Sequence, residues 1–362
     1  MHLSAKSKKR LTRDQQKNVT SIATLQDLDT LEIAKQNKLS SIGTHTRLSN
    51  QLTRNSISSI NNFKLKKGIQ CLSTRSLAFK TKSSEDFKLL QSKLSGISAK
   101  SLTIARLNPR FEIILSRDQM EKRKIASLTK IMTLHCSLKI SKLFKIDLNS
   151  TIVTISEKGA SINGTSAQLK PGDKLSLYDL LYGMMLPSGN DAAHSLAEYF
   201  GKVIIASKLF NCSRNDAVRA FIDYMNQQAK LLKMHNTFYM NPHGLDNKEA
   251  YSCSEDVAKL CAVVLKNDLF RSIARTKEYT VSIERDRKPF EINWVNTNKL
   301  LAEDENCLGL KTGVTPQAKP CLATYWSFKN SEYLVVVIGC SDKAQRNKES
   351  RELAYEMYNL YN

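Results

Sequence analysis

The sequence predicts an α+β fold in which strands from both ends of one folded body form a sheet. Two observations lead to this prediction. Strand-like segments open and close a body that spans residues 99–362, and a block of helical segments lies between them. This order suggests that the two ends of the body meet in space. With 362 residues, of which 41% are hydrophobic, the chain can bury a sizeable core.

Residues 1–98 differ in composition from the body, and we predict that they form a basic, low-complexity leader that is largely disordered. They are rich in Ser, Thr, Lys, Asn and Gln and lack sustained apolar periodicity, apart from a short helix expected at 24–36. Residues 1–100 hold 19 Lys and Arg against 6 Asp and Glu, and so carry most of the net charge of +21. This acid-poor composition is similar to an organelle-targeting sequence, and a polybasic tail for an acidic partner is the alternative.

The sequence does not determine the compartment. No apolar run of signal-peptide type follows the basic N-terminus, and apolar runs such as 334–339 are too short to span a bilayer. We therefore expect no secretory signal and no transmembrane segment, which leaves an organelle or the cytoplasm. The basic leader lacks interleaved aromatic residues and an RNA-binding signature, so nucleic acid is not an expected partner.

The eight cysteines are scattered, at 71, 136, 212, 253, 261, 307, 321 and 340. They form no CxxC pair and match no zinc pattern, so we expect no metal site. Buried free thiols are the favoured interpretation, and a disulfide network is the alternative.

In the first half of the body, apolar runs separated by turn residues predict strands followed by helices. The expected strands are 101–107, 111–118 (after a turn at Asn108-Pro109) and the strand-like stretch 151–159. The expected helices begin near Ser127, at 176 and at Asp191. A Pro-Gly turn at 171–172 precedes the second helix, and the loop 187–190 separates the second from the third.

The second half has two further helical stretches and then becomes rich in strands. Apolar periodicity predicts helices over 217–234 and 254–267. Alternating, β-branched and aromatic residues predict strands at 278–285, 290–297, 321–330 and 332–341. An amphipathic helix over 348–360 closes the chain.

Ser127 and Lys130 lie three residues apart in the stretch ASLTK, at the start of a predicted helix. This spacing places both side chains on one helical face, within contact distance. A serine hydroxyl is a weak nucleophile near neutral pH, but a lysine whose pKa is lowered by burial can act as its base. In the loop PSGN, Ser188 and Asn190 are expected to project the same way, where they can relay a proton and bind a substrate amide.

The stretch LKTG offers groups that can bind the end of a substrate. Lys311 and Thr312 supply a cation and a hydroxyl for a carboxylate, and Gly313 leaves the strand edge open to a ligand. The backbone N–H groups of Ser127 and Val314 are candidates for an oxyanion hole. An acyl-transfer site needs these parts together: nucleophile, proton route, oxyanion hole and substrate contacts.

Each motif alone is weak, but the three in this order, on helix, loop and strand, match the signature of penicillin-recognising serine enzymes. From about residue 100 to 362 the chain resembles the D-alanyl-D-alanine carboxypeptidases, the low-molecular-mass penicillin-binding proteins of serine peptidase family S11. Besides ASLTKIMT at 126–133, the resemblance is carried by the stretches 180–198, 229–246 and 309–322.

The resemblance implies the β-lactamase/transpeptidase-like fold, an antiparallel sheet packed against helices, with an all-helical lobe and the active site at their junction. It implies a penicillin-binding serine carboxypeptidase domain over 99–362 that forms an acyl-enzyme on Ser127 and releases D-alanine from the end of peptidoglycan-type peptides. The expected partners are peptides ending in D-Ala-D-Ala and covalent β-lactam ligands, and no cofactor is expected.

The chain departs from the family's pattern at three positions. Lys233 and Lys319 stand where the family has glycine, and at Lys319 a backbone conformation that glycine eases must be reached otherwise. Thr297 stands where many members carry arginine, which leaves the second contact to the substrate carboxylate open. His243, in NPHGLD, is a candidate to support the site from behind, or else a packed side chain.

Two other functions stay open. A β-lactamase-like hydrolase would need a dedicated carboxylate for deacylation, and the Glu-x-x-Leu-Asn pattern of class A enzymes does not occur between Asn190 and Lys311. A catalytically silent peptide-binding module of the same fold is the other alternative, and the intact Ser127 and Lys130 argue against it. A Ser-His-Asp triad is not indicated, because the sequence supplies a lysine beside Ser127.

Overall fold

The computed structural model describes residues 77–79, 92, 94–210, 212–213 and 215–361. The predicted helix at 24–36, Cys71 and most of the predicted leader lie outside these residues. Within 1–98, the strand β1 (Leu77–Phe79) pairs with β3 (Glu112–Arg117), and Leu94 and Ile97 are buried. The sheet and the core therefore include residues that precede position 99.

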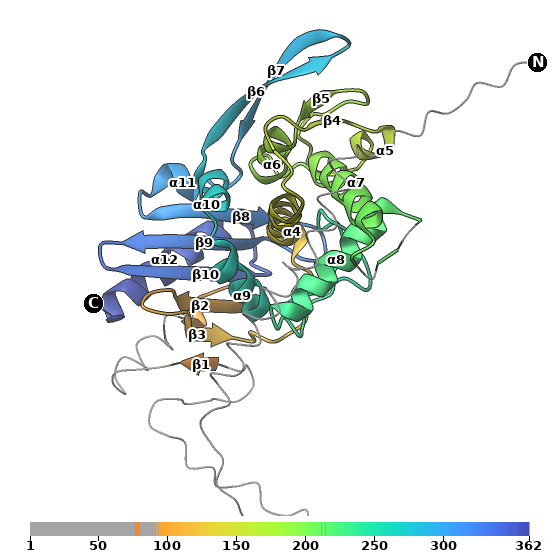
Figure 1. The fold of residues 1–362 in the computed structure, drawn as a ribbon. Coiled ribbons are helices and arrows are strands. Elements are labelled where there is room, and N and C mark those ends of the chain that lie inside the picture. The colour runs from red at the N-terminus through yellow and green to blue at the C-terminus, as the bar shows by residue number, and fades with distance from the viewer. Residues whose placement is uncertain (1–76, 80–91, 93, 211, 214, 362) are drawn as a thin grey trace, which may run out of the picture. The chain divides into compact units, whose positions relative to one another are not determined.

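A six-stranded antiparallel sheet with the order β1-β3-β2-β10-β9-β8 forms the centre of the fold (Figure 1). Besides β1 and β3, the sheet contains β2 (Ser101–Arg106), β8 (Cys307–Gly313), β9 (Cys321–Phe328) and β10 (Ser331–Ile338). β2 pairs with β10, and Ser101 lies opposite Ile338. The two ends of the body thus meet in one sheet, as the sequence predicts.

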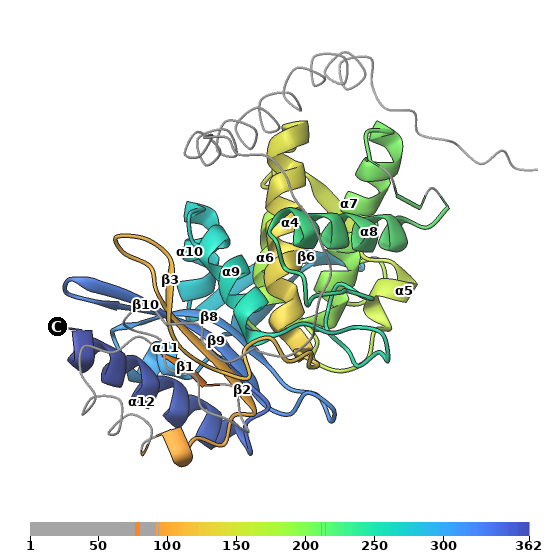
Figure 2. The same ribbon diagram turned by 90° about the horizontal axis from the view of Figure 1, so that it is seen from below.

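Helices cover both faces of this sheet, so β10 is buried on both sides. Tyr333, Val335 and Val337 pack in the apolar cluster of α12 (Lys343–Tyr361). The residues between them pack on the opposite face, with α9 (Ser254–Val264) and α10 (Asp268–Arg275) (Figure 2). Helix α10 was not predicted from the sequence. Its first turn is capped by Asn267, which accepts a hydrogen bond from the N–H of Phe270.

The middle of the chain forms a helical lobe beside the sheet. Its helices are α4 (Thr129–Phe144), α5 (Glu157–Ala160), α6 (Leu177–Met185), α7 (Asn190–Ser207) and α8 (Ala217–Leu231). α4 packs against α6, α7, α8 and α9, and most of its residues are buried. Because α4 is enclosed by other helices, its first turn, which carries the predicted site, has a fixed position.

A second antiparallel sheet, β4-β5-β6-β7, was not separated from the first by the sequence analysis. Its strands are β4 (Ile152–Thr154), β5 (Lys174–Ser176), β6 (Glu278–Arg285) and β7 (Lys288–Val295). Buried and exposed residues alternate over much of β6 and at the end of β7, so this hairpin has only one covered face, whereas β9 and β10 are covered on both. The strand predicted at 151–159 is short because Ser156 caps α5.

Seven of the eight cysteines lie in the described part of the chain, and the six other than Cys212 are free thiols. These six are buried, which confirms the predicted scattered thiols for their positions, and Cys212 is half-buried. Burial raises the pKa of Cys261 to about 12 and keeps that thiol protonated. Among the described residues, no helix has both the length and the apolar character that a membrane crossing requires.

Candidate active site

The predicted nucleophile lies in a short 3-10 turn, Ala126–Leu128, that leads directly into α4. Ala126 has a φ of +48°, which residues other than glycine rarely adopt. Two glycines from distant segments leave room for this turn. A Cβ on Gly244 would lie 2.0 Å from the backbone oxygen of Ala126, and one on Gly313 would lie 2.9 Å from the nitrogen of Ser127. The turn is therefore held between the end of β8 and the loop that contains Gly244.

Lys130 lies in the first turn of α4, and its side chain contacts three polar groups. Its Nζ lies 2.9 Å from Ser127 Oγ, 2.7 Å from Asn190 Oδ1 and 2.8 Å from the backbone oxygen of His243. The amide and backbone oxygens can only accept hydrogen bonds. A neutral Lys130 amine therefore donates its N–H groups to these two acceptors, and its lone pair is left for the Ser127 hydroxyl.

Burial and a neighbouring charge both favour the neutral form of Lys130. The side chain is 0% exposed. Burial and then the positive charge of Lys311 lower the pKa of Lys130 well below its usual value, while Asp191 acts in the opposite direction. Lys311 is itself buried, and burial and then Arg346 lower the pKa of Lys311 to about 7. The chain thus provides a lysine that can accept a proton from Ser127.

The residues of the predicted PSGN loop have different surroundings. Ser188 has a φ of +65° and lines the open cavity in front of Ser127. Asn190 accepts from Lys130 through Oδ1 and donates through Nδ2 to the backbone oxygen of Asn163 at 2.7 Å. Both ends of the Asn190 amide therefore have partners within the protein, and its direct role here is to orient Lys130.

An open cavity of about 790 Å³ brings together residues that lie far apart in the chain. The predicted site residues that line it are Ser127, Ser188, Thr312, Gly313 and Val314. Lys311 does not line it, because its Nζ is turned to the backbone oxygen of Thr312 at 3.1 Å. Arg346 of α12 is 5% exposed and lines the same cavity. The sequence analysis missed Arg346, because only the packing of α12 on the sheet brings it to the site.

The three departures from the family's pattern have distinct structural settings. Lys319 has a φ of +58° and Lys233 a φ of +56°, so both lysines adopt the left-handed conformation that glycine eases. This confirms the expectation for Lys319. Thr297 Oγ1 lies 2.7 Å from Thr312 Oγ1, so a hydroxyl stands beside the predicted carboxylate contact.

His243 belongs to a loop, residues 241–251, that lies behind the nucleophile turn. Its backbone oxygen contacts Lys130, while its ring Nδ1 accepts from the N–H of Leu245 at 3.3 Å. Burial is the main cause that lowers the pKa of His243 to about 3, so the ring is neutral. His243 therefore contacts Lys130 through its backbone oxygen, and the supporting role suggested for it from the sequence stays a prediction.

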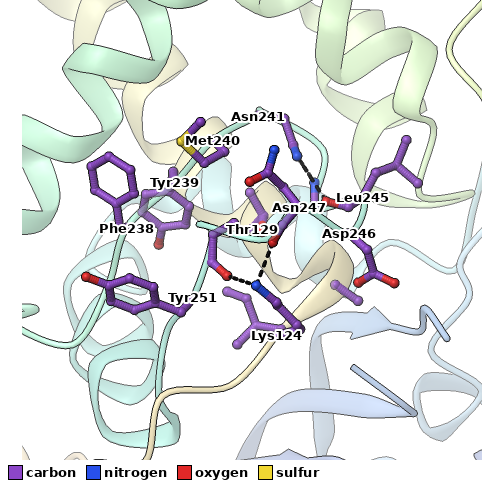
Figure 3. A pocket seen from close by; sticks show the side chains of 14 residues that line it. Lys124, Thr129, Phe238, Tyr239, Met240, Asn241, Leu245, Asp246, Asn247 and Tyr251 are labelled. Carbon is purple, nitrogen blue, oxygen red and sulfur yellow. Dashed lines mark hydrogen bonds between the residues drawn. The ribbon is translucent and has the colours of Figure 1, made fainter. Parts of the chain in front are cut away.

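Lys124, which the sequence analysis did not single out, fastens this loop to the segment before the nucleophile turn. Its Nζ donates to the backbone oxygens of Asn247 at 2.5 Å, Lys248 at 2.8 Å and Ala250 at 2.6 Å. Figure 3 shows the Lys124 side chain directed at the loop. All three N–H groups of the ammonium are therefore used on one loop.

Asp191 is a second residue that the sequence analysis missed. It lies in the first turn of α7, directly after the PSGN loop, and is 1% exposed. Its carboxylate accepts from the N–H of Ala167 at 2.9 Å and of Leu169 at 3.2 Å, and from Ser166 Oγ at 2.6 Å. Asp191 thereby ties the start of α7 to a neighbouring segment and keeps the PSGN loop in place. Acidic residues are common in the first turn of a helix, so nothing in the sequence around Asp191 marked it as part of the site.

Comparisons with known proteins agree with this geometry. The profile of the D-alanyl-D-alanine carboxypeptidase family, peptidase family S11, matches residues 91–342. A D-alanyl-D-alanine carboxypeptidase of a Streptomyces species is 36% identical over 204 residues, which cover 56% of this chain and 67% of the relative. One from Bacillus subtilis is 30% identical over 257 residues, which cover 69% of this chain and 61% of the relative.

A solved structure shares the fold at a comparable identity. The Streptomyces K15 DD-transpeptidase superposes with a TM-score of 0.65 and 29% identity, covering 73% of this chain and 98% of that one. A D-alanyl-D-alanine carboxypeptidase of Francisella tularensis gives a TM-score of 0.62 and 26% identity, covering 72% and 70%. With a buried lysine beside the serine of ASLTK and a family profile that spans most of the folded body, the chain belongs to the D-alanyl-D-alanine carboxypeptidase family of serine peptidases.

Proposed function

We propose that this chain is a serine D-Ala-D-Ala carboxypeptidase that works through an acyl-enzyme on Ser127. The observation that carries the proposal is the buried Lys130, whose Nζ lies 2.9 Å from Ser127 Oγ while two acceptors hold its N–H groups. The substrate is a peptide that ends in D-Ala-D-Ala, and β-lactams acylate the same serine. The names of the relatives, which this chain covers to about two thirds or less of their length, point to the same reaction.

The first half-reaction transfers the acyl group to Ser127. Its Oγ attacks the carbonyl carbon of the penultimate D-alanine while Lys130 takes the hydroxyl proton. The backbone N–H groups of Ser127 and Val314 bind the oxygen that becomes negative. The C–N bond then breaks, and the leaving amine takes a proton that passes from Lys130 through the Ser188 hydroxyl. The products of this half-reaction are an ester on Ser127 and free D-alanine.

The second half-reaction returns the enzyme to its starting state. A water molecule attacks the ester carbonyl and gives its proton to Lys130, so that the lysine serves again as the base. The C–O bond to Ser127 breaks, and the proton returns to Oγ. The net reaction consumes one water and yields a shortened peptide and D-alanine.

Two groups of this chain suit the terminal carboxylate of the substrate. Thr312 and Arg346 both line the cavity with Ser127, and a buried guanidinium binds a carboxylate strongly. In this proposal Arg346 supplies the cationic contact that Thr297 does not. Lys311, predicted from the sequence to bind the carboxylate directly, acts instead as a buried charge that keeps Lys130 neutral.

Covalent labelling by a fluorescent penicillin tests the proposed function. We expect the parent protein to be labelled on Ser127 and the label to be lost in Ser127→Ala, because that substitution removes the only atom that forms the ester. Hydrolysis of a D-Ala-D-Ala peptide should be lost in parallel. Absence of labelling in well-folded protein would favour a peptide-binding module, and rapid turnover of the penicillin ester would favour a β-lactamase.

The charge of Lys311 predicts a shift in pH dependence. Lys130 works as a base only when it is neutral, so acylation rises as the pH rises through the pKa of Lys130. The Lys311 cation, which predominates below its own pKa of about 7, lowers the pKa of Lys130, and Lys311→Met removes this cation. We therefore expect the acidic limb of the penicillin acylation profile to move to higher pH in Lys311→Met.

The control for this shift is Lys329→Met, which changes the net charge equally at an exposed turn beyond β9. Its pH profile should match that of the parent protein. An acidic limb at the same pH in Lys311→Met and in the parent would contradict the role assigned to Lys311.

A further inference from the structure

The cavity at the active site extends beyond the residues that the proposed reaction uses. Its volume of about 790 Å³ lies within the range of ~300–1,000 Å³ typical of pockets for drug-sized ligands. A leaving D-alanine, with its single methyl group, fills only a small part of it. The additional wall is formed by α12 and by the segment around α11 (Leu300–Glu303), which precedes β8. The cavity therefore has room for a leaving residue larger than D-alanine.

The additional wall is strongly cationic. Its charged residues are Lys299, Glu303, Lys343, Arg346, Lys348 and Arg351. Arg351 is paired with Glu303 at 2.6 Å, and Lys348 with Glu352 at 3.8 Å. Lys299 and Lys343 are exposed, and no carboxylate of the described residues forms an ion pair with either. After Arg346 is assigned to the terminal carboxylate, two cations of this wall are left without a partner.

Both unpaired lysines lie next to the proposed carboxylate contacts. Lys343 precedes Arg346 by three residues on α12, about one helical turn. Lys299 follows Thr297 by two residues, and Thr297 Oγ1 lies 2.7 Å from Thr312 Oγ1. The group of a substrate nearest to its terminal carboxylate is the side chain of the leaving residue itself. Long, flexible lysine side chains on either side of that carboxylate can reach this side chain.

We infer that the site accepts, besides D-alanine, leaving D-residues with an acidic side chain and favours them over neutral or basic residues of similar size, with Lys299 and Lys343 as the residues that bind this side chain. This inference rests on the proposed function and specifies its substrate class. A second carboxylate on the leaving residue meets two free cations in a cleft, where low-dielectric walls strengthen the attraction. A basic leaving residue meets repulsion from the same two groups, which costs affinity.

A set of peptides that differ only in the leaving residue tests the inference. The peptides end in D-Ala-D-Xaa, where Xaa is alanine, glutamine, glutamate or lysine, and kcat/KM is measured for each with the full chain. We expect kcat/KM for D-glutamate to exceed that for its neutral isostere D-glutamine by about fivefold, as surface charge pairs of ordinary strength predict. D-Lysine should be the poorest substrate, and added salt should reduce the preference for glutamate.

The double variant Lys299→Gln/Lys343→Gln links the preference to these two residues. Its ratio of kcat/KM for D-glutamate over D-glutamine should fall to near one. The double variant Lys329→Gln/Lys145→Gln removes the same charge from exposed turns outside the cavity and should keep the parent ratio. A ratio of one in the parent, or an unchanged ratio in Lys299→Gln/Lys343→Gln, would overturn the inference.

The outcomes separate this inference from the proposed function. Cleavage of the D-alanine peptide without a preference for D-glutamate rejects the acidic leaving residue and keeps the carboxypeptidase. No cleavage of any of the four peptides by protein that is folded, as shown by its thermal transition, rejects the carboxypeptidase and the inference with it.

Discussion

Replacing Lys130 by methionine is expected to slow the acylation of Ser127 by about 10²–10⁴-fold, the usual contribution of a positioned general base. Methionine has a similar length but no lone pair on nitrogen, so Ser127 loses the acceptor that lies 2.9 Å from its Oγ. The measurement is the rate of covalent labelling by a fluorescent penicillin, compared with the parent protein under the same conditions.

The same substitution also affects stability, so folding must be followed separately. Without the lysine, Asn190 Oδ1 and the backbone oxygen of His243 each lose a hydrogen-bond donor, at a cost of about 1–3 kcal/mol per buried group. Removal of a buried amine offsets part of this cost. Thermal unfolding identifies the fraction that is folded at the assay temperature. Labelling of folded Lys130→Met at the parent rate would show that Lys130 is not the base.

Replacing Gly244 by alanine is expected to displace the nucleophile turn and to remove most of the acylation activity. Gly244 has a φ of +89°, and a Cβ there would lie 2.0 Å from the backbone oxygen of Ala126. Because the obstructing atom belongs to the backbone of the turn that holds Ser127, the clash cannot be relieved by a side-chain rotation. Penicillin labelling measures the loss, and chemical unfolding measures the accompanying loss of stability.

Gly172→Ala is a matched control for this substitution. Gly172 has a φ of +86°, almost the same as Gly244, but no atom lies within 4 Å of the position of its Cβ. We therefore expect Gly172→Ala to lose about 1–3 kcal/mol of folding stability through backbone strain alone. The variant should be labelled at the parent rate. Equal losses of labelling in the two variants would mean that backbone strain, rather than contact with the nucleophile turn, is responsible.

The parts of the site that depend on local chemistry were accessible from the sequence. Ser127 and Lys130 are three residues apart on one helix, so their contact follows from helical geometry alone. Ser188, Asn190, Thr312 and Gly313 were found because their stretches have a recognisable order of residue types. These residues meet at the start of α4, as predicted.

The parts that depend on packing were not accessible. Arg346 reaches the cavity only because α12 lies against the sheet, and nothing in the residues around it marks that position. Burial and then the charge of Arg346 lower the pKa of Lys311, and α12 supplies that charge. From the sequence, the substrate carboxylate was assigned to Lys311 and Thr312, whereas the function proposed here assigns the cationic contact to Arg346.

The division of the strands into two sheets follows from a pattern that was present in the sequence. The stretch EYTVSIER alternates polar and apolar residues, and in β6 it covers only one face. The apolar run at 334–339 lies mostly in β10, which is buried on both faces. The sequence therefore distinguishes strands buried on one face from strands buried on both. The strands were predicted without this distinction, so the two sheets were not separated.

Lys124 and Lys130 lie on either side of Ser127 in the sequence, and both donate hydrogen bonds to the loop 241–251. Lys124 donates to three backbone oxygens between Asn247 and Ala250, and Lys130 donates to that of His243. The loop cannot move away from the turn without breaking its hydrogen bonds to both lysine side chains. In hydrogen-exchange terms, the loop and the turn therefore form one cooperative opening unit, whose amides are exposed to solvent together rather than in sequence.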